Sequence, residues 1–191
     1  MKKKMLLTFA VLALTMGQAT AQRVLPKMQG IAIVGGFVDG KSDSFYGGMT
    51  IDTYTKGGNK WVFGAEYLQR NHKYEHGENG SQTIPVAQFT AEGGFCKLVL
   101  SDASKSFLAY FGVSALAGYE TVNWNDKLLD DGSCLTGKDG IVYGCAATLN
   151  VEWYLSDKVV LTGNVRERFL RGNTYGHSHA QYGIGLKFII N

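Results

Sequence analysis

Hydrophobic and polar residues alternate along much of the chain. In residues 142–155, VYGCAATLNVEWYL, seven mostly apolar positions from Tyr143 to Leu155 share one face, while small or polar residues share the other. A period of two indicates a β-strand, because a helix would scatter these residues around its circumference. This segment is therefore expected to be a strand with one apolar and one polar face.

The same alternation predicts seven further strands. In the better-defined ones, aromatic residues such as Trp61, Phe89 and Phe107 stand opposite glycine or polar residues. Glu167 interrupts the apolar face of its segment. The eight expected strands cover residues 29–38, 44–54, 60–71, 86–97, 106–120, 142–155, 158–170 and 179–190.

The links between these strands differ in length. Short turns follow the second, fourth and sixth strands, and longer loops follow the third, fifth and seventh, while the first link, DGKSD, is short. An even number of strands with short turns at one end and long loops at the other is typical of outer-membrane barrels. We therefore expect an all-β fold: an eight-stranded antiparallel transmembrane β-barrel. Its last strand should pair with its first, with both chain ends on the short-turn, periplasmic side.

Alternation alone leaves open which face points outward, since a soluble lipocalin-like barrel alternates in the opposite sense. Two features favour lipid outside. Aromatic residues lie near both ends of the apolar face, as bilayer interfaces select. The polar face mixes small residues with charges of both signs that can pair inside a narrow barrel. These charges are Glu66, Arg70, Glu92, Glu152, Arg166, Arg168 and Lys187.

The last strand also resembles the C-terminal insertion signal of bacterial outer-membrane proteins. Gln181, Gly183, Leu186 and Phe188 supply a polar residue, a glycine and two hydrophobic positions at the appropriate spacing. The chain departs from that signal by finishing on Ile-Ile-Asn rather than on an aromatic residue. The soluble barrel and other β folds remain alternatives.

Residues 1–21 have the layout of a cleavable secretory signal: three lysines, a short apolar stretch, and Ala-Thr-Ala before Gln22. Removing Lys2, Lys3 and Lys4 changes 19 basic against 16 acidic residues to 16 against 16, so the mature chain is neutral. It lacks the clustered basic charge of a nucleic-acid footprint. We expect residues 22–191 to form a single barrel domain, exported through the periplasm to the outer membrane.

The three cysteines allow one disulfide with one thiol left over. Cys134 lies in the long loop before residues 142–155, and Cys145 lies on the apolar face of that strand. A bridge between them would require the loop to fold down over the outer wall. Cys96 is interpreted as a small buried filler.

Histidine and serine residues near the long loops suggest two kinds of site. His177 and His179 could bind a metal together with His72 or His76 across the rim, although solvated loop tips explain the same residues. His177-Ser178-His179, with Glu167 as a partner, could support acyl transfer. We predict neither: no catalytic, cofactor-binding or metal-binding residue, no cofactor, and no enzymatic activity.

Residues 140–173 carry a resemblance to a known family. Their sequence is GIVYGCAATLNVEWYLSDKVVLTGNVRERFLRGN, a strand, a tight turn and an Arg-Glu-Arg strand. With the chain length, the Ala-Gln signal junction and the glycine-rich last strand, they resemble the TraO family of conjugal-transfer proteins from Bacteroides-type conjugative transposons. The family offers no catalytic or ligand-binding residue to carry over.

The resemblance implies a component of the cell-envelope mating apparatus that moves single-stranded DNA between cells. A barrel of eight strands is filled by its own side chains and cannot be the DNA conduit, and the neutral chain lacks a basic groove for single strands. We expect a non-enzymatic anchor or scaffold whose partners are outer-membrane lipid and other transfer proteins, without direct nucleic-acid binding. An adhesin that uses the long loops, especially residues 123–140, and a lipid-modifying enzyme remain alternatives.

Overall fold

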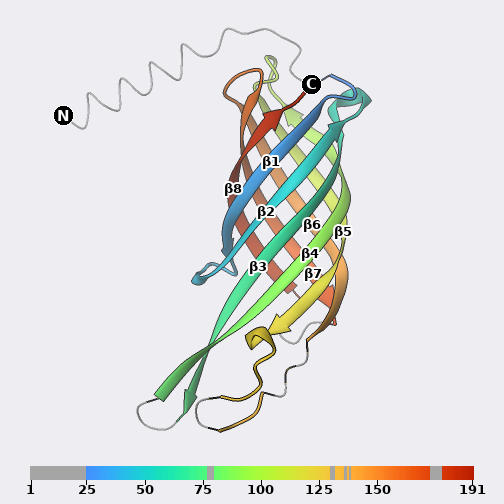
Figure 1. Cartoon of the computed structure of the whole chain (residues 1–191). Helices are drawn as coiled ribbons and strands as arrows, with labels where there is room; N and C mark the ends of the chain where they lie inside the picture. The colour runs from blue at the N-terminus through green and yellow to red at the C-terminus, as the bar shows by residue number, and fades with distance from the viewer. Residues whose placement is uncertain (1–24, 77–79, 130–131, 136, 138, 173–177) are drawn as a thin grey trace, which may run out of the picture.

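The computed structural model describes residues 25–76, 80–129, 132–135, 137, 139–172 and 178–191. Eight antiparallel strands follow one another around a closed barrel (Figure 1). They are β1 (Gln29–Val38), β2 (Lys41–Tyr54), β3 (Lys60–His76), β4 (Gly80–Ser101), β5 (Phe107–Val122), β6 (Gly140–Tyr154), β7 (Val159–Arg171) and β8 (Ser178–Ile189). The expected all-β, eight-stranded antiparallel barrel is confirmed as a fold. No helix within the described ranges is long and apolar enough to cross a membrane.

The barrel is closed by pairing of β1 with β8. The ladder runs from Gly30 opposite Ile189 to Val38 opposite Gln181. The backbone N–H of Ile190 extends it by donating to the carbonyl oxygen of Gln29 over 2.9 Å. The predicted pairing of the first and last strands is therefore confirmed, and neither keeps an open edge along this ladder.

The link between β1 and β2 shows how local sequence sets the geometry. Asp39 and Gly40 have φ angles of 53° and 65°, and Val38 pairs with Lys41 across them. Two consecutive residues with positive φ form the tight turn whose twist matches a β-hairpin, and Asp-Gly is among the sequences that favour it. The short DGKSD link thus becomes a two-residue turn.

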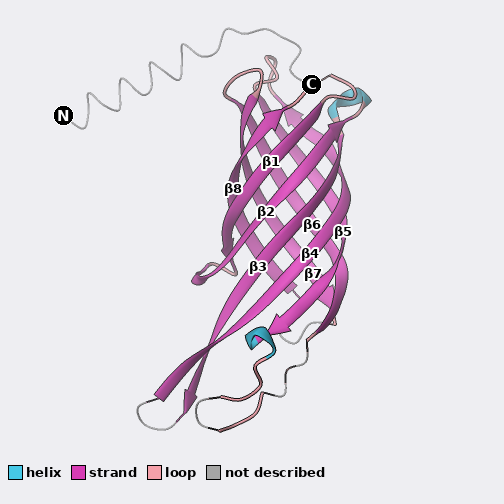
Figure 2. Cartoon of the chain, in the orientation of Figure 1, coloured by secondary structure: helices cyan, strands magenta, loops and turns pink. Residues whose placement is uncertain are grey.

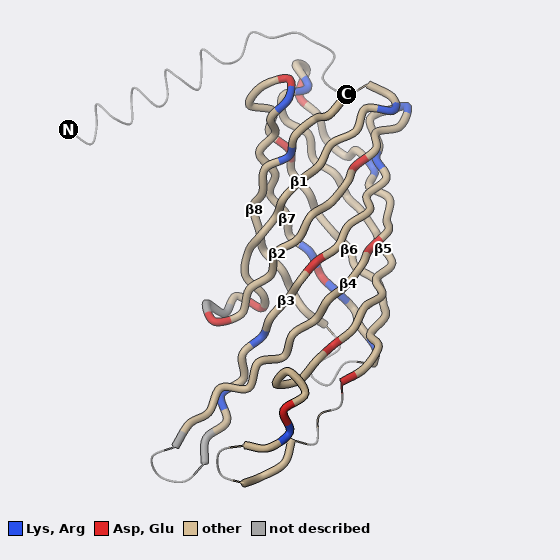
Figure 3. Tube along the Cα trace, viewed as in Figure 1, with Lys and Arg blue, Asp and Glu red and all other residues tan. Residues whose placement is uncertain are grey.

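The two faces of the wall have the orientation that the sequence predicts. Large apolar side chains such as Trp61, Val113 and Ile184 are exposed on the outside, whereas Arg168, Lys187 and Glu152 are among the most deeply buried side chains. Figure 3 colours the basic and acidic residues along the trace. The barrel is apolar outside and polar inside, the reverse of a soluble barrel.

β3 and β4 extend further than the expected ranges 60–71 and 86–97. Within the described residues, β4 is the only strand that pairs with β3 beyond Gln69, so the two form a ribbon that projects past the other strands (Figure 2). The ribbon is supported by tertiary packing: Ile84 and Val86 are buried against Val122 and Leu129 of the neighbouring strand and loop. The alternation of residues did not predict these extensions, because the packing that stabilises them involves residues distant in sequence.

Candidate functional site

The interior near the short-turn end holds a cluster of two lysines and two acids. The ammonium nitrogen of Lys60 lies 2.9 Å from Asp52 Oδ2 and 2.5 Å from Glu152 Oε1. Lys187 forms ion pairs with the same two acids. None of the four side chains is more than 3% exposed, and their formal charges cancel. A buried charge is tolerated only when it is paired in this way.

Tyrosines complete the hydrogen bonding of this inner cluster, which comprises Asp52, Lys60, Glu152 and Lys187. Tyr54 donates its hydroxyl hydrogen to Glu152 Oε2 over 2.7 Å, and the Lys60 ammonium lies 4.7 Å from the ring centroid of Tyr110. Tyr54, Tyr110 and Tyr154 pack with apolar residues that include Met28, Leu108 and Val160. The short-turn end of the interior is thus filled by side chains.

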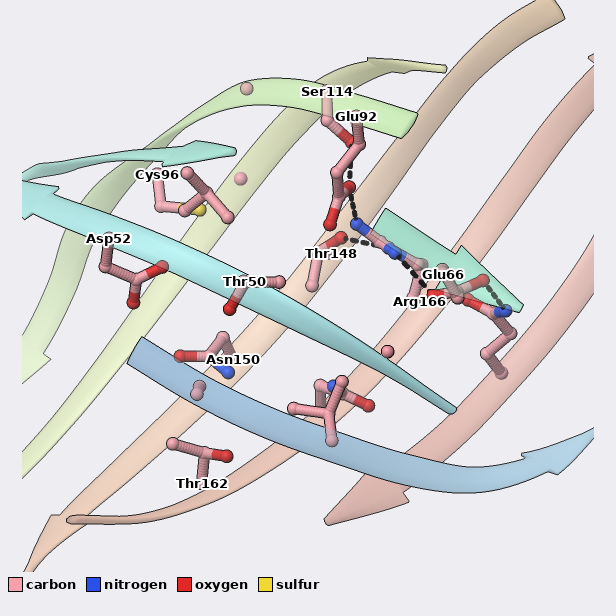
Figure 4. A pocket seen from close by; sticks show the side chains of 18 of the residues that line it. Thr50, Asp52, Glu66, Glu92, Cys96, Ser114, Thr148, Asn150, Thr162 and Arg166 are labelled. Atoms are coloured by element: carbon pink, nitrogen blue, oxygen red, sulfur yellow. Dashed lines mark hydrogen bonds and ion pairs between the residues drawn. The ribbon is translucent and has the colours of Figure 1, made fainter. Parts of the chain in front are cut away.

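A second charged cluster lies further along the barrel and contains Glu66, Glu92, Arg166 and Arg168. Arg166 pairs with Glu92 and with Glu66, the latter at 3.1 Å, and Arg168 reaches the other oxygen of Glu66 at 2.7 Å. Thr148 accepts a hydrogen bond from Arg166 Nε. Figure 4 shows Arg166 between the two glutamates, which come from different strands. The forked guanidinium can bind two carboxylates at once, and this contact ties opposite parts of the wall together.

A cavity of about 60 Å³ remains between the two clusters. Its walls include Thr50, Asn150 and Thr162, which point into it in Figure 4. A buried water needs on the order of 10–15 Å³ of such space. The cavity therefore has room for a few waters and is far too small for a nucleic-acid strand.

The seven charged residues predicted for the polar face all lie on the inner side, and six belong to these two clusters. The seventh, Arg70, is nearer the long loops and lies 3.1 Å from Asp39. The sequence reasoning missed Asp52 and Lys60. Both lie within the expected strands 44–54 and 60–71, so applying the alternation to every position of those two segments would have placed them on the inner face.

The three cysteines are all free. Cys145 is exposed on the outer face of β6, opposite Ala115 and Phe169 on the adjacent strands. Cys134 is exposed in the loop, where its backbone bridges to Leu128. The bridge weighed between Cys134 and Cys145 is not formed, whereas Cys96 is buried as expected.

The histidine and serine candidates do not come together. His179 is buried inside the barrel with its Nδ1 atom 3.6 Å from Asp39, whereas Ser178 lies on the outer face and donates a hydrogen bond to Glu167. Neighbouring strand residues face opposite sides, so the wall separates the two. His177 and the side chain of His76 lie outside the described residues. Among the described ones, no three metal-ligating side chains of the His, Cys, Asp and Glu types are grouped to hold an ion.

Comparison with known sequences then decides the family. The sequence profile described as "Conjugative transposon protein TraO" matches residues 25–190. The chain belongs to the TraO family. This match confirms the predicted resemblance and identifies the chain as a conjugation-related protein. A comparison with curated proteins gives no significant match.

Solved structures share the architecture of this TraO-family chain at low sequence identity. The N-terminal β-barrel domain of Pseudomonas aeruginosa OprF has a TM-score of 0.50 at 8% identity, covering 86% of this chain and 98% of that domain. Neisserial surface protein A has a TM-score of 0.48 at 14% identity, with 85% and 95% covered. The attachment invasion locus protein Ail of Yersinia pestis has a TM-score of 0.49 at 9% identity, with 85% and 97% covered. At such identities, the OprF likeness supports the fold alone.

Proposed function

We propose that this TraO-family protein is a non-enzymatic outer-membrane component of the conjugative DNA-transfer apparatus, where it anchors or positions other transfer proteins. The observation that carries the proposal is the combination of an apolar outer wall with a closed, charge-paired interior in a chain of this family. Such a wall requires lipid around it, and such an interior leaves the outer wall, the turns and the loops as the surfaces available to partners.

Two aromatic girdles support insertion in a bilayer. One lies toward the short turns and the other toward the long loops, and large rings enriched at two levels mark the two membrane interfaces. Nearly all of these side chains are about half exposed on the outer face. They include Trp61, Phe107, Trp153 and Phe188 toward the turns, and Phe37, Phe45, Tyr119, Tyr143 and Phe169 toward the loops. Residues 1–21 would serve as the export signal, leaving residues 22–191 as one barrel domain.

The interior argues against a role as the DNA conduit. A 60 Å³ cavity between two networks of ion pairs cannot admit a polynucleotide, and opening it would separate buried charges at a cost of several kcal/mol for each ion left unpaired. The protein would therefore act by holding partners in the envelope. Outer-membrane lipid and other envelope transfer proteins are the partners that this role implies, without direct contact to DNA.

Deleting the gene from a donor strain tests the proposal. We expect mating frequency to fall sharply while growth is unchanged, and complementation with the full chain to restore it. Membrane fractionation of the complemented strain should recover the protein with the outer membrane. Unchanged mating after deletion would reject the role in transfer. A mature polypeptide that stays folded and monomeric in buffer without detergent would reject the membrane location.

A further inference from the structure

Three consecutive residues after β5 have left-handed backbone conformations. Asn123, Trp124 and Asn125 have φ angles of 49°, 53° and 67°, and the residues on either side are extended. Asparagine tolerates this region of φ and ψ, but a bulky residue such as tryptophan rarely adopts it. Such conformations persist only where the surrounding structure enforces them, and they concentrate at binding sites.

The structure enforces this turn from both sides. Within it, the side-chain amide of Asn123 donates to the carbonyl oxygen of Asp126 over 2.8 Å, and the backbone N–H of Asp126 donates back to the carbonyl of Asn123 over 2.9 Å. Below it, Asp139 accepts hydrogen bonds from the Thr121 hydroxyl and the Val122 N–H, each at 2.9 Å. These hydrogen bonds fix the backbone of the turn that presents Trp124.

Trp124 is presented to solvent among polar neighbours. Its side chain is 57% exposed, and Asn125, Asp126 and Lys127 beside it are also exposed. The turn lies at the long-loop end of the barrel, away from the described chain ends (Figure 1). The turn thus presents an exposed aromatic ring that is followed in sequence by an exposed amide, carboxylate and ammonium group.

We propose that Trp124 is the stacking platform of a carbohydrate-binding site on the long-loop end of the barrel, with Asn125, Asp126 and Lys127 as the polar contacts. A sugar ring has an apolar C–H face that lies flat on an aromatic ring and a rim of hydroxyl groups that donate and accept hydrogen bonds. The chemistry of the turn matches both. The ligand class is an oligosaccharide, as found in the polysaccharide on bacterial surfaces.

Two other occupants fit less well. A stable protein interface buries roughly 800 Å² on each partner around an apolar centre, whereas Trp124 and Leu128 are the large exposed apolar side chains in the described part of this loop. Insertion into the bilayer would require the outer wall. Trp124 lies beyond that wall, because β5 ends at Val122, which still pairs with Val86 of β4.

This site goes beyond the proposed anchoring role and does not depend on it. A sugar-binding turn would hold the donor's barrel against surface polysaccharide, either on the same cell or on a recipient. The binding chemistry is the same in both cases. Polysaccharide prepared separately from donor and recipient strains distinguishes the two sources.

The fluorescence of Trp124 provides a direct test. The double substitution Trp61→Phe and Trp153→Phe leaves Trp124 as the sole tryptophan, and this variant of the full mature chain is folded in detergent micelles. It is then titrated with delipidated surface polysaccharide from each strain. We expect a blue shift of the emission and at least a twofold drop in quenching by aqueous iodide with polysaccharide from at least one strain.

Variants of the turn separate stacking from loop structure. In the otherwise native chain, Trp124→Ala should weaken polysaccharide binding at least tenfold as measured by calorimetry, and Trp124→Phe should weaken it less, because a smaller ring still stacks. Urea unfolding of the barrel provides the control for folding, and both variants should match the native chain. No emission change with either polysaccharide, or equal binding by Trp124→Ala, overturns the proposal. Quenching of Trp124 by brominated lipid in vesicles also overturns it, since it would place the ring in the bilayer. None of these results bears on the proposed role in conjugation, which the deletion strain tests separately.

Discussion

Replacing Glu152 with Gln isolates the contribution of the inner cluster to stability. Glu152 is fully buried and accepts from three groups: Lys60 at 2.5 Å, Lys187, and the Tyr54 hydroxyl at 2.7 Å. The substitution keeps the side-chain size but removes one of two negative charges. Two buried ammonium groups are then left with Asp52 alone, and the new amide N–H₂ is a further donor among donors.

The expected loss of unfolding free energy follows from the change in the net charge of the inner cluster. The cluster changes from neutral to a net charge of one, and leaving a buried charge without its partner typically costs about 3–5 kcal/mol. The retained amide oxygen can still accept one hydrogen bond, so we expect the lower end, about 3 kcal/mol. This corresponds to roughly a hundredfold or more in the unfolding equilibrium constant, because each 1.4 kcal/mol is about tenfold.

Urea titration of the protein in lipid vesicles, followed by tryptophan fluorescence, measures the change. Asp43→Asn is the control, since the corresponding change of an acid to an amide at an exposed position beside the β1–β2 turn should stay within about 0.5 kcal/mol. Adding Lys60→Met to Glu152→Gln restores neutrality and should recover at least half of the loss. The reasoning is wrong if Glu152→Gln costs less than about 1 kcal/mol, or if the second substitution deepens the loss, because charge balance would then not control stability.

Three further outcomes are expected. Gly144→Ala should destabilise the barrel by about 1–3 kcal/mol, because the new Cβ would clash with the backbone of the adjacent strand. Gly163→Ala has open space around the new Cβ, so paired urea titrations should show a change within about 0.5 kcal/mol. Slight burial opposes ionisation of Asp102, but hydrogen bonds from its own turn outweigh it and lower the pKa of that carboxyl. The Asp102 carboxylate should therefore stabilise the fold above about pH 4, the ordinary range for the pKa of Asp. This stabilisation should be lost as the pH falls through the lowered pKa of the folded state. The unfolding free energies of Asp102→Ala and the native chain should then converge at low pH. In vesicles, a water-soluble maleimide should label Cys134 and spare Cys145 until urea unfolds the barrel. Equal labelling rates in the folded protein would contradict a lipid-covered outer wall.

Much of the wall could be predicted from the sequence, because a half-buried strand shows its two faces directly as a period of two. Trp61 and Glu66 lie on opposite faces of β3 as that period requires. Alternation stops being informative where both faces become polar. The part of β3 after residue 71 therefore escaped prediction, although it pairs with β4 as far as His76 opposite Gly80.

The contacts inside the barrel were less accessible to sequence reasoning. Parity places Glu66 and Arg168 on the inner face, but which charges meet depends on the stagger between strands that are distant in sequence. The left-handed turn around Trp124 was also missed. Asparagine is common in such turns, but tryptophan rarely adopts this conformation. The turn is held in part by the hydrogen bond from the Val122 N–H to Asp139, a contact between the two ends of the loop that local sequence does not reveal.

The seam between β1 and β8 has a consequence for biogenesis. It joins Gly30 to Ile189, so the first strand made must wait for the last before the wall can seal. Ladders between such distant segments form late and slowly, because the whole intervening chain must be ordered first. Until β8 has been made, the polypeptide is therefore an open chain whose unpaired strand edges can aggregate.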